Sequence, residues 1–161
     1  MPLAVTVDGA DEVDPQLDLI KGYGRAMVRE KIVAAASRRL VILVGKEKRV
    51  PALGSRGKRP IEVVPYGLAL CLTRLQEIGL APTPYRTEGK LYLSDNSNHI
   101  IDCHTNAITD PENLEKTLRA IPGVVGTGLF LEMASVVLVG DEDRDFALVE
   151  EKHRGPGANG A

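Results

Sequence analysis

The sequence contains no tryptophan, few aromatic residues, only two cysteines and no long apolar run. A membrane-spanning helix needs about 20 consecutive apolar residues, so a transmembrane protein is not expected. Cys71 and Cys103 have no CxxC partner, which gives no metal or redox motif, suits a reducing compartment and predicts that both are core residues. Met1 precedes a short strand-like run without a basic and apolar leader, so we expect a cytoplasmic location.

An excess of charge of either sign is also missing, since the net charge is −2 at pH 7. Nucleic acid is not the expected partner, because binding a phosphate backbone needs a concentrated basic surface. With 161 residues, 43% of them apolar, the chain can bury one sizeable core or two small ones. These properties predict a globular protein that binds a small molecule.

The first part of the chain follows the order strand, loop, helix, strand. Residues 3–7 (LAVTV) form a β-branched apolar run that predicts a buried strand ending in a loop. A helix is predicted over 25–39, with Val28, Ile32 and Ala35 on one face, and a second strand over 40–45. This order indicates a βαβ unit with a parallel sheet.

From residue 60 the pattern changes to β-α-β-β-α-β, with an additional short strand, which suggests a ferredoxin-like module. Its candidate elements are a strand at 61–64, a helix at 66–78, strands at 84–86, 91–94 and 100–104, and a helix that begins at Asp110-Pro111 and ends by Pro122-Gly123. A further strand, ASVVLVG at 134–140, is expected to return to the first sheet.

The predicted fold class is therefore α/β, with a partial Rossmann-like parallel sheet and an inserted ferredoxin-like α+β module. The expected domains are a Rossmann-like domain at 1–59 and 129–150 and a small lid domain at 60–128. The last twenty residues indicate a frayed tail, and a disordered segment is expected at 151–161.

Four carboxylates crowd the loop after the first strand: Asp8, Asp11, Glu12 and Asp14. Open α/β sheets place their ligands at the carboxyl ends of their strands, so this loop is a candidate site. The carboxylates could provide an acid or base, or share a cation, or form a solvated acidic loop that caps the following turn. The spacing does not fit an EF-hand.

Lys21 precedes Gly22 and Gly24 in a turn that opens the first helix. Such a turn offers free amides and a positive dipole end to an oxyanion, or it is simply a helix start. Glu30, on that helix, is either a functional carboxylate or the solvated partner of a neighbouring basic side chain.

The combination of DGADE at 8–12, KGYG at 21–24 and REKIVA at 29–34 resembles the signature of the A-type ribose-5-phosphate isomerases. The likeness continues through VGKEK at 44–48, IEVVP at 61–65, SDNSNHIID at 94–102 and IPGVVGTGLF at 121–130. It covers nearly the whole chain apart from the tail.

The resemblance assigns a role to each matching residue. It implies that Asp8 and Asp11 are active-site aspartates, Lys21 the active-site lysine and Glu30 the catalytic glutamate. Lys48 matches the lysine that follows the second strand, and is expected to bind substrate.

The implied reaction interconverts ribose 5-phosphate and ribulose 5-phosphate through an enediolate, with Glu30 moving the proton between C2 and C1. Lys21 and the backbone amides of Gly22 and Gly24 would stabilise the charged intermediate. Asp8 would assist ring opening, and Asp11 would orient the substrate hydroxyls and Lys21. No metal or cofactor is expected, and the family resemblance suggests a dimer or tetramer.

Two departures from the family stand out. Tyr23 and Arg25 occupy positions where the family tends to have small or apolar residues, which predicts a bulkier turn and a more polar mouth of the site. The chain also begins after the family's first helix, first strand and TGST-like phosphate loop. We therefore expect an exposed apolar sheet edge and helix-facing surface, to be covered by an upstream segment, a second chain or a homodimer. The basic residues around Lys48 could supply phosphate contacts or form a solvated loop.

Two other functions remain open. The chain could be an inactive or regulatory sugar-phosphate binding module derived from such an enzyme, although it carries no helix-turn-helix segment. Alternatively, the acidic loop could hold Mg²⁺ and support phosphoryl chemistry.

Overall fold

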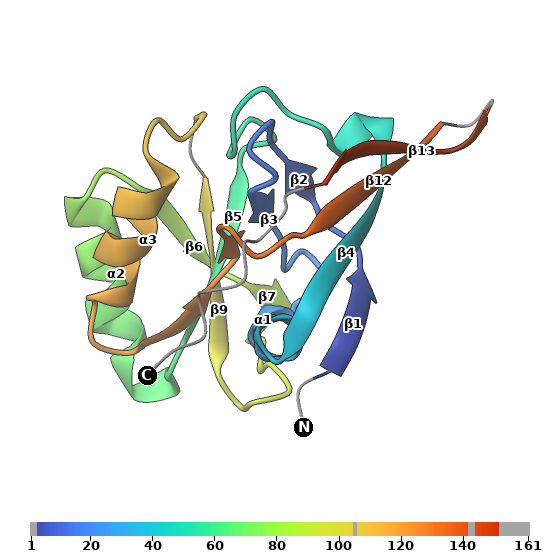
Figure 1. Cartoon of the computed structure of the whole chain (residues 1–161). Coiled ribbons are helices and arrows are strands. Elements are labelled where there is room, and N and C mark those ends of the chain that lie inside the picture. Colours follow the sequence, from blue (N-terminus) through green and yellow to red (C-terminus); the bar gives the residue numbers. More distant parts are fainter. Residues whose placement is uncertain (1–2, 105, 142–143, 152–161) are drawn as a thin grey trace.

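The computed structural model describes residues 3–104, 106–141 and 144–151 (Figure 1). A four-stranded sheet, called sheet A, has the order β1-β4-β12-β13. Its strands are β1 (Leu3–Asp8), β4 (Ser37–Gly45), β12 (Val136–Asp141) and β13 (Arg144–Glu151). The first three are parallel and β13 is antiparallel to β12, so the predicted parallel sheet and the return of the chain to it are confirmed.

Helix α1 (Met27–Ala35) connects β1 to β4 and ends four residues before the predicted boundary. Residues 37–39 belong to β4 instead, because pairing with β1 extends that strand. Leu3 lies opposite Ser37 in the parallel register, and the Leu3 amide donates to the Ala36 carbonyl over 2.9 Å. Tertiary pairing thus ends the helix earlier than its apolar periodicity suggests.

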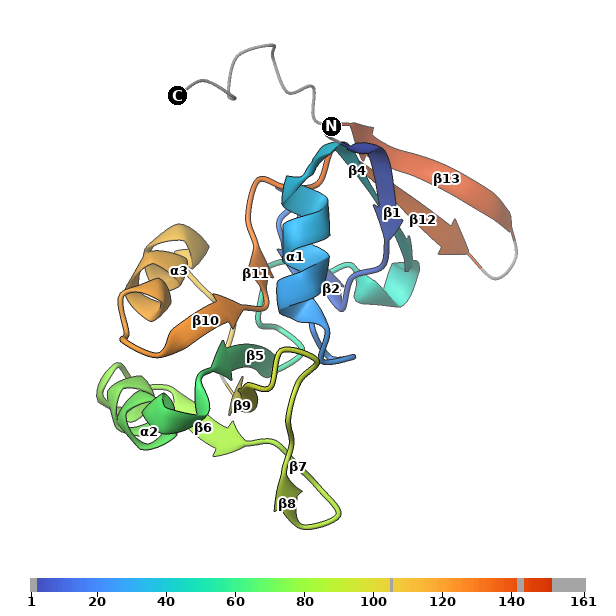
Figure 2. The ribbon, with the colours of Figure 1, turned by 90° about the horizontal axis from the view of Figure 1, so that it is seen from below.

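The apolar side chains predicted on one face of α1 do line one hollow, but that face is only partly buried. Ile32 is 63% exposed, whereas Met27 is fully buried and Ala34 nearly so. Lys31 lies on the same side of the helix as Ile32, and its Nζ donates to the Leu129 carbonyl over 2.7 Å. Figure 2 shows α1 between the strands of sheet A and strands β10 and β11.

One face of sheet A is exposed to solvent along β1 and part of β4. The apolar side chains of Leu3, Val5 and Val7 are 46%, 51% and 58% exposed, and Leu43 of β4 is 38% exposed. The opposite face carries Leu40, Ile42 and Val44, which pack beneath α1 in one of the two hydrophobic cores. The prediction of β1 as a buried strand is therefore wrong, and the predicted exposed apolar surface is present.

The second sheet has the order β10-β5-β9-β6 and is antiparallel throughout. Its strands are β5 (Lys58–Val63), β6 (Ala81–Pro84), β9 (His99–His104) and β10 (Val124–Thr127). Helices α2 (Leu68–Glu77) and α3 (Pro111–Arg119) cover one of its faces (Figure 1). Strands β7 (Arg86–Thr87) and β8 (Lys90–Leu91) form a separate hairpin. The predicted β-α-β-β-α-β order is thus present, although 92–94 is not strand.

Alternate residues of β9 face two different cores. Ile101 and Cys103 belong to the core under α2 and α3, and Ile100 belongs to the core shared with sheet A. Asp102 alternates in the same way and lies on the face of Ile100. Cys71 and Cys103 are both buried, as predicted. At α3, Asp110 caps the helix by accepting from the Asn113 amide over 3.0 Å, and Pro111 follows it, also as predicted.

A small third sheet, order β11-β3-β2, was not predicted. It consists of β2 (Glu12–Val13), β3 (Leu19–Ile20) and β11 (Leu129–Phe130). Two short 3-10 helices, η1 (Lys46–Lys48) and η2 (Pro65–Gly67), follow β4 and β5. Because β2 and β3 have two residues each, no apolar alternation reveals them.

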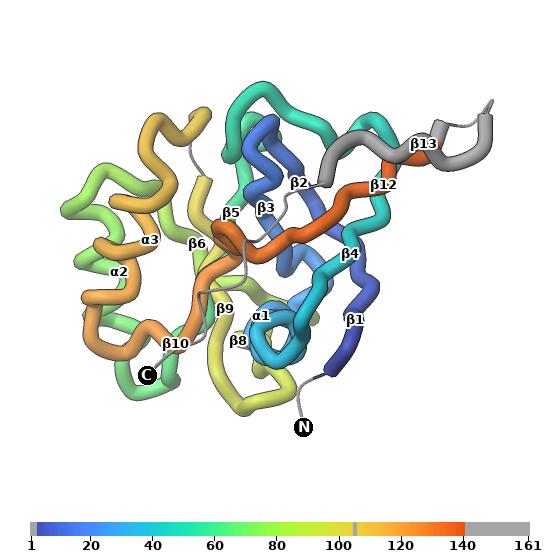
Figure 3. The backbone as a smooth tube through the Cα atoms, in the orientation of Figure 1, coloured from blue at the N-terminus to red at the C-terminus, as the bar shows by residue number. Residues whose placement is uncertain are grey.

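Figure 3 traces the chain from sheet A into the second sheet and back through β11 and β12. Residues 144–151 form β13, so the frayed tail predicted for the last twenty residues is wrong over that stretch. The predicted disordered segment from 152 onward lies outside the described residues. The domain boundaries at 59/60 and 128/129 stay a prediction. Within 3–104, 106–141 and 144–151, no helix has the length and apolar character needed to cross a bilayer.

We predict that two leucines of the same strand differ strongly in their contribution to stability. Leu40→Ala opens a cavity in the core and should lower the free energy of unfolding by about 2–5 kcal/mol. Leu43→Ala, on the exposed face, should lower the free energy of unfolding by less than about 1 kcal/mol. Urea unfolding of both variants measures the difference. Equal losses would mean that the outer face is covered in solution.

Candidate functional site

A hollow of about 210 Å³ lies at the carboxyl end of β1. Six of the seven predicted site residues line it, together with two small neighbours: Asp8, Gly9, Ala10, Asp11, Lys21, Gly22, Gly24 and Glu30. Three segments contribute: the loop after β1, the turn after β3, and α1. The fold thus brings together residues that are up to 22 positions apart in the sequence.

Lys21 is the centre of this hollow and is only 4% exposed. Its Nζ lies 2.9 Å from Asp8 Oδ2 and 3.3 Å from Glu30 Oε2, and it donates to the Gly9 carbonyl over 2.5 Å. An ammonium group has three donors, and three oxygens from two segments surround this one. A buried ammonium is costly unless it is paired and hydrogen-bonded, so these contacts stabilise Lys21 in place.

Glu30 lies on α1, with its side chain 29% exposed. Its Oε2 is close to Lys21 Nζ but receives no well-directed hydrogen bond from the described residues. The carboxylate is therefore held near a positive charge with an oxygen still able to accept a proton. This is the geometry expected of a general base.

The two aspartates of the hollow make different contacts. Asp8 Oδ1 accepts from the Gly9 amide over 2.8 Å, while its other oxygen pairs with Lys21. Asp11 Oδ2 accepts from the Tyr23 amide over 3.0 Å and so ties the acidic loop to the glycine turn. Asp8 thus contacts the Lys21 side chain, whereas Asp11 contacts the backbone of the turn that follows Lys21.

The other two carboxylates of the acidic loop are structural. Glu12 is fully buried and accepts from the amides of Gly54 and Arg56 over 2.6 and 2.8 Å. Asp14 Oδ1 accepts from the amides of Gln16 and Asp18 over 3.0 and 2.9 Å, which caps the β2–β3 turn. The capping interpretation therefore holds for this part of the loop, and only Asp8 and Asp11 face the hollow.

The two glycines of the turn are needed for different reasons. Gly22 has φ +107°, and a Cβ there would lie 2.8 Å from Met27 Cβ and 2.9 Å from Pro60 Cγ. Gly24 is exposed, and a Cβ there would meet nothing within 4 Å. Gly22 is thus required by the backbone, whereas Gly24 leaves space open at the mouth of the hollow.

Gly128 supports the site and was not predicted. The Lys21 amide donates to the Gly128 carbonyl over 2.8 Å, and a Cβ on Gly128 would lie 2.4 Å from the Lys21 carbonyl oxygen. Only a residue without a side chain lets β10 and β11 approach Lys21 so closely. The contact joins positions far apart in the sequence, so no local pattern could have indicated it.

Lys48 lies outside this hollow. It is the last residue of η1, directly after β4, whose carboxyl end is next to that of β1 in the parallel sheet. Lys48 therefore shares the sheet edge with Asp8 without lining the same space. Its predicted role in substrate binding stays a prediction.

Tyr23 and Arg25 turn away from the mouth of the site, contrary to the expectation of a more polar entrance. The Tyr23 hydroxyl donates to the Lys58 carbonyl over 3.1 Å, and the Arg25 side chain is buried. Burial raises the pKa of the Tyr23 phenol to about 12, and the carboxylates of Glu12 and Asp11 add to this rise. The phenol thus keeps its proton over a wide pH range.

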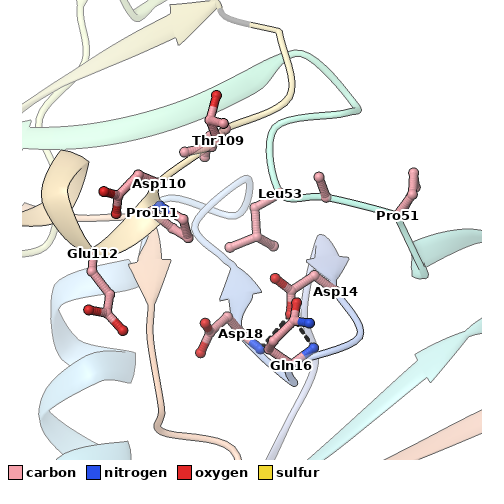
Figure 4. A pocket seen from close by; sticks show the side chains of 11 residues that line it. Asp14, Gln16, Asp18, Pro51, Leu53, Thr109, Asp110, Pro111 and Glu112 are labelled. Carbon is pink, nitrogen blue, oxygen red and sulfur yellow. Dashed lines mark hydrogen bonds between the residues drawn. The ribbon is translucent and has the colours of Figure 1, made fainter.

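A second hollow, of about 450 Å³, lies between the β2–β3 turn and the start of α3 (Figure 4). Its acidic side chains include Asp14, Asp18, Asp110 and Glu112. Figure 4 shows the Asp14 carboxylate bound to the local backbone, and Asp18 Oδ1 accepts from the Glu132 amide over 2.6 Å. Across the part of the chain that is described, no three His, Cys, Asp or Glu side chains are grouped to hold a metal ion.

The fold and the hollow define an α/β protein with its functional loop at the carboxyl end of a parallel strand, a common location for ligand sites. Comparison with known proteins narrows this class. The family model for ribose 5-phosphate isomerase A, or phosphoriboisomerase A, matches residues 1–144. The chain therefore belongs to the ribose 5-phosphate isomerase A family.

Individual relatives agree with this assignment. A ribose-5-phosphate isomerase A of Roseiflexus sp. (strain RS-1) is 49% identical over 142 residues, which cover 88% of this chain. One from Gloeobacter violaceus is 47% identical over 139 residues, or 86% of this chain. The chain spans 61% and 60% of the length of these two relatives.

Solved structures show the same fold. The ribose 5-phosphate isomerase of Plasmodium falciparum is 33% identical, with a TM-score of 0.90 over 95% of this chain and 68% of its own. The ribose 5-phosphate isomerase A of Methanocaldococcus jannaschii is 35% identical, with a TM-score of 0.86 over 94% and 67%. The predicted fold class and family resemblance are both confirmed.

We predict that substitution by alanine destabilises the protein strongly at one glycine of the turn and little at the other. Gly22→Ala should destabilise the protein by about 1–3 kcal/mol, because it adds strain at positive φ and a clash with Met27. Gly24→Ala, the matched control, should cost less than about 0.5 kcal/mol. The free energy of urea unfolding measures both. Equal losses would contradict the described turn.

We also predict an alkaline loss of stability that depends on Tyr23. The phenol's pKa is raised to about 12 in the folded state, whereas in the unfolded chain it is about 10. The stabilisation is complete below about pH 10 and is lost as the pH rises toward about 12. Tyr23→Phe should therefore lose less unfolding free energy than the natural protein between about pH 10 and pH 12, the range given by these two pKa values. Equal losses would contradict the burial of the phenol.

Proposed function

We propose that this chain carries the proton-transfer centre of an aldose–ketose isomerase that interconverts D-ribose 5-phosphate and D-ribulose 5-phosphate. The observation that carries the proposal is the position of Lys21 Nζ between Asp8 Oδ2 and Glu30 Oε2, at 2.9 and 3.3 Å. A base and a buried cation next to each other can take a proton from carbon and stabilise the resulting oxyanion.

Glu30 is the proposed shuttle. Its carboxylate takes the proton from C2 of the open-chain aldose, forms an enediolate, and returns a proton to C1 to give the ketose. Lys21 and the amides of Gly22 and Gly24 stabilise the charge that develops on the two substrate oxygens. Asp8 assists ring opening and proton movement between oxygens, and Asp11 orients the substrate hydroxyls while it fixes the turn.

The phosphate is proposed to bind away from the carboxylates. Three carboxylates and one ammonium group line the hollow, so its charge repels a phosphate. Lys48, at the same sheet edge but outside the hollow, is the proposed phosphate contact within this chain. The substrate would then extend from the proton-transfer groups along the carboxyl ends of β1 and β4.

Relatives support this substrate class. A solved D-ribose-5-phosphate isomerase that is 36% identical to this chain, with a TM-score of 0.87, is in complex with phospho-erythronic acid. That ligand combines a phosphate with a carboxylate, an anion of the kind that a lysine such as Lys21 would hold in place of an enediolate. We further propose a cytoplasmic location and a homo-oligomer, a dimer or tetramer.

The decisive experiment compares the natural protein with Glu30→Gln, assayed with ribose 5-phosphate in the presence and absence of EDTA. Glu30→Gln keeps the size of the side chain and removes the base, so kcat should fall by about 10²–10⁴-fold. EDTA should have no effect on the natural protein. Glu77→Gln on α2, about half exposed and paired with the nearby Arg74, is the matched control and should keep full activity.

Other outcomes would favour the alternative functions. Binding of ribose 5-phosphate without turnover would indicate a sugar-phosphate binding or regulatory module in place of an enzyme. Activity that requires Mg²⁺ would contradict the metal-free mechanism and support phosphoryl chemistry at the acidic loop. Undiminished turnover in Glu30→Gln would exclude Glu30 as the base.

A further inference from the structure

Arg25 has an unusual backbone conformation next to the proposed site. It lies at φ +75°, in the left-handed region, directly after Gly24 and two residues before α1 begins. A residue with a side chain adopts this region only when its surroundings compel it, and such residues cluster at functional sites. The Arg25 amide donates to the Gly22 carbonyl over 2.9 Å and closes the glycine turn.

The Arg25 side chain is anchored in the second sheet. This side chain is 8% exposed, and its guanidinium donates to both oxygens of Asp102, over 2.6 Å to Oδ1 and 3.0 Å to Oδ2. Its Cζ also lies 3.6 Å from the ring centroid of Tyr85. A two-pronged contact stacked on an aromatic ring fixes both the position and the plane of the guanidinium.

Asp102 connects to the same turn by a second route. Lys58 Nζ lies 3.3 Å from Asp102 Oδ2 and 5.2 Å from the ring centroid of Tyr23. The Tyr23 hydroxyl donates to the Lys58 carbonyl. One buried carboxylate of β9 is therefore linked to both non-glycine residues that follow Lys21 in the turn.

We infer that Arg25 and Asp102 form a positioning pair that holds the Lys21–Gly24 turn and the start of α1 in their active geometry. This inference rests on the proposed function. A buried ion pair is weak evidence for stability, because desolvation offsets much of its attraction, but it does specify geometry. Here the geometry specified is that of the segment between Lys21 and Glu30, so β9 of the small sheet sets the distance between the cation and the base.

The test uses variants of the whole chain that distinguish the effect of the Arg25 side chain from the effect of its backbone conformation. Arg25→Gly removes the ion pair, and glycine adopts φ +75° without strain. Asp102→Asn removes the charge from the other partner. Arg25→Lys keeps the charge but not the planar fork. Glu88→Gly is the matched control, because Glu88 also has positive φ (52°) but is exposed in the β7–β8 turn.

In the isomerase assay, Arg25→Gly and Asp102→Asn should each lower kcat by about 10–100-fold, because displacement of catalytic groups by about 1 Å has effects of that size. KM should stay within about twofold. The kcat of Arg25→Lys should lie between the values of these variants and that of the natural protein. Glu88→Gly should keep full activity. The double variant Arg25→Gly/Asp102→Asn should be no worse than either single variant, as expected for groups that act as one unit.

A second measurement does not depend on activity. In Arg25→Gly the Tyr23 amide, which is bound to Asp11, should exchange its hydrogen at least about tenfold faster, while amides paired between β4 and β12 keep their protection. Unchanged kcat or unchanged Tyr23 exchange in Arg25→Gly would overturn the inference. If the natural protein showed no turnover, the proposed function would fail, and the exchange rates would still decide whether the pair holds the turn.

Discussion

The interaction on which the described site depends is the pairing of one buried ammonium group with two carboxylates. Lys21 is almost inaccessible to solvent, and its Nζ faces Asp8, Glu30 and the Gly9 carbonyl at once. Removing that charge would leave two carboxylates facing each other with no compensation, and removing the carboxylates would leave a buried cation unpaired. The end of β1, the glycine turn and α1 are therefore held in one arrangement by the same group.

This arrangement draws on both sheets. Pairing of β1 with β4 places Asp8 at the carboxyl edge of sheet A. The close approach of Gly128 supports the backbone of Lys21, and the Asp102 carboxylate of β9 holds the turn through Arg25. The small sheet is consequently more than an insertion beside sheet A. It contributes the packing that determines where the lysine lies.

The sequence predicted which residues line the hollow better than it predicted their surroundings. The order and spacing of Asp8, Lys21 and Glu30 are local features, and their residue types limit what they can do. The burial of α1 depends instead on contacts with distant segments, and Ile32 of its predicted apolar face is 63% exposed. Likewise, the exposure of β1 depends on what covers its sheet, and the hairpin of β2 and β3 is too short to produce a periodic pattern.

The central claim is that a carboxylate moves a proton between two carbons of the sugar. The most direct test is to convert ribose 5-phosphate in D₂O and to examine C1 of the ribulose 5-phosphate by NMR. Because the Glu30 side chain is 29% exposed, the proton it takes can exchange with solvent before it is returned. Deuterium is therefore expected at C1 of the product. Product that stays free of deuterium through many rounds of the reversible reaction would contradict this exchange and favour a direct hydride shift.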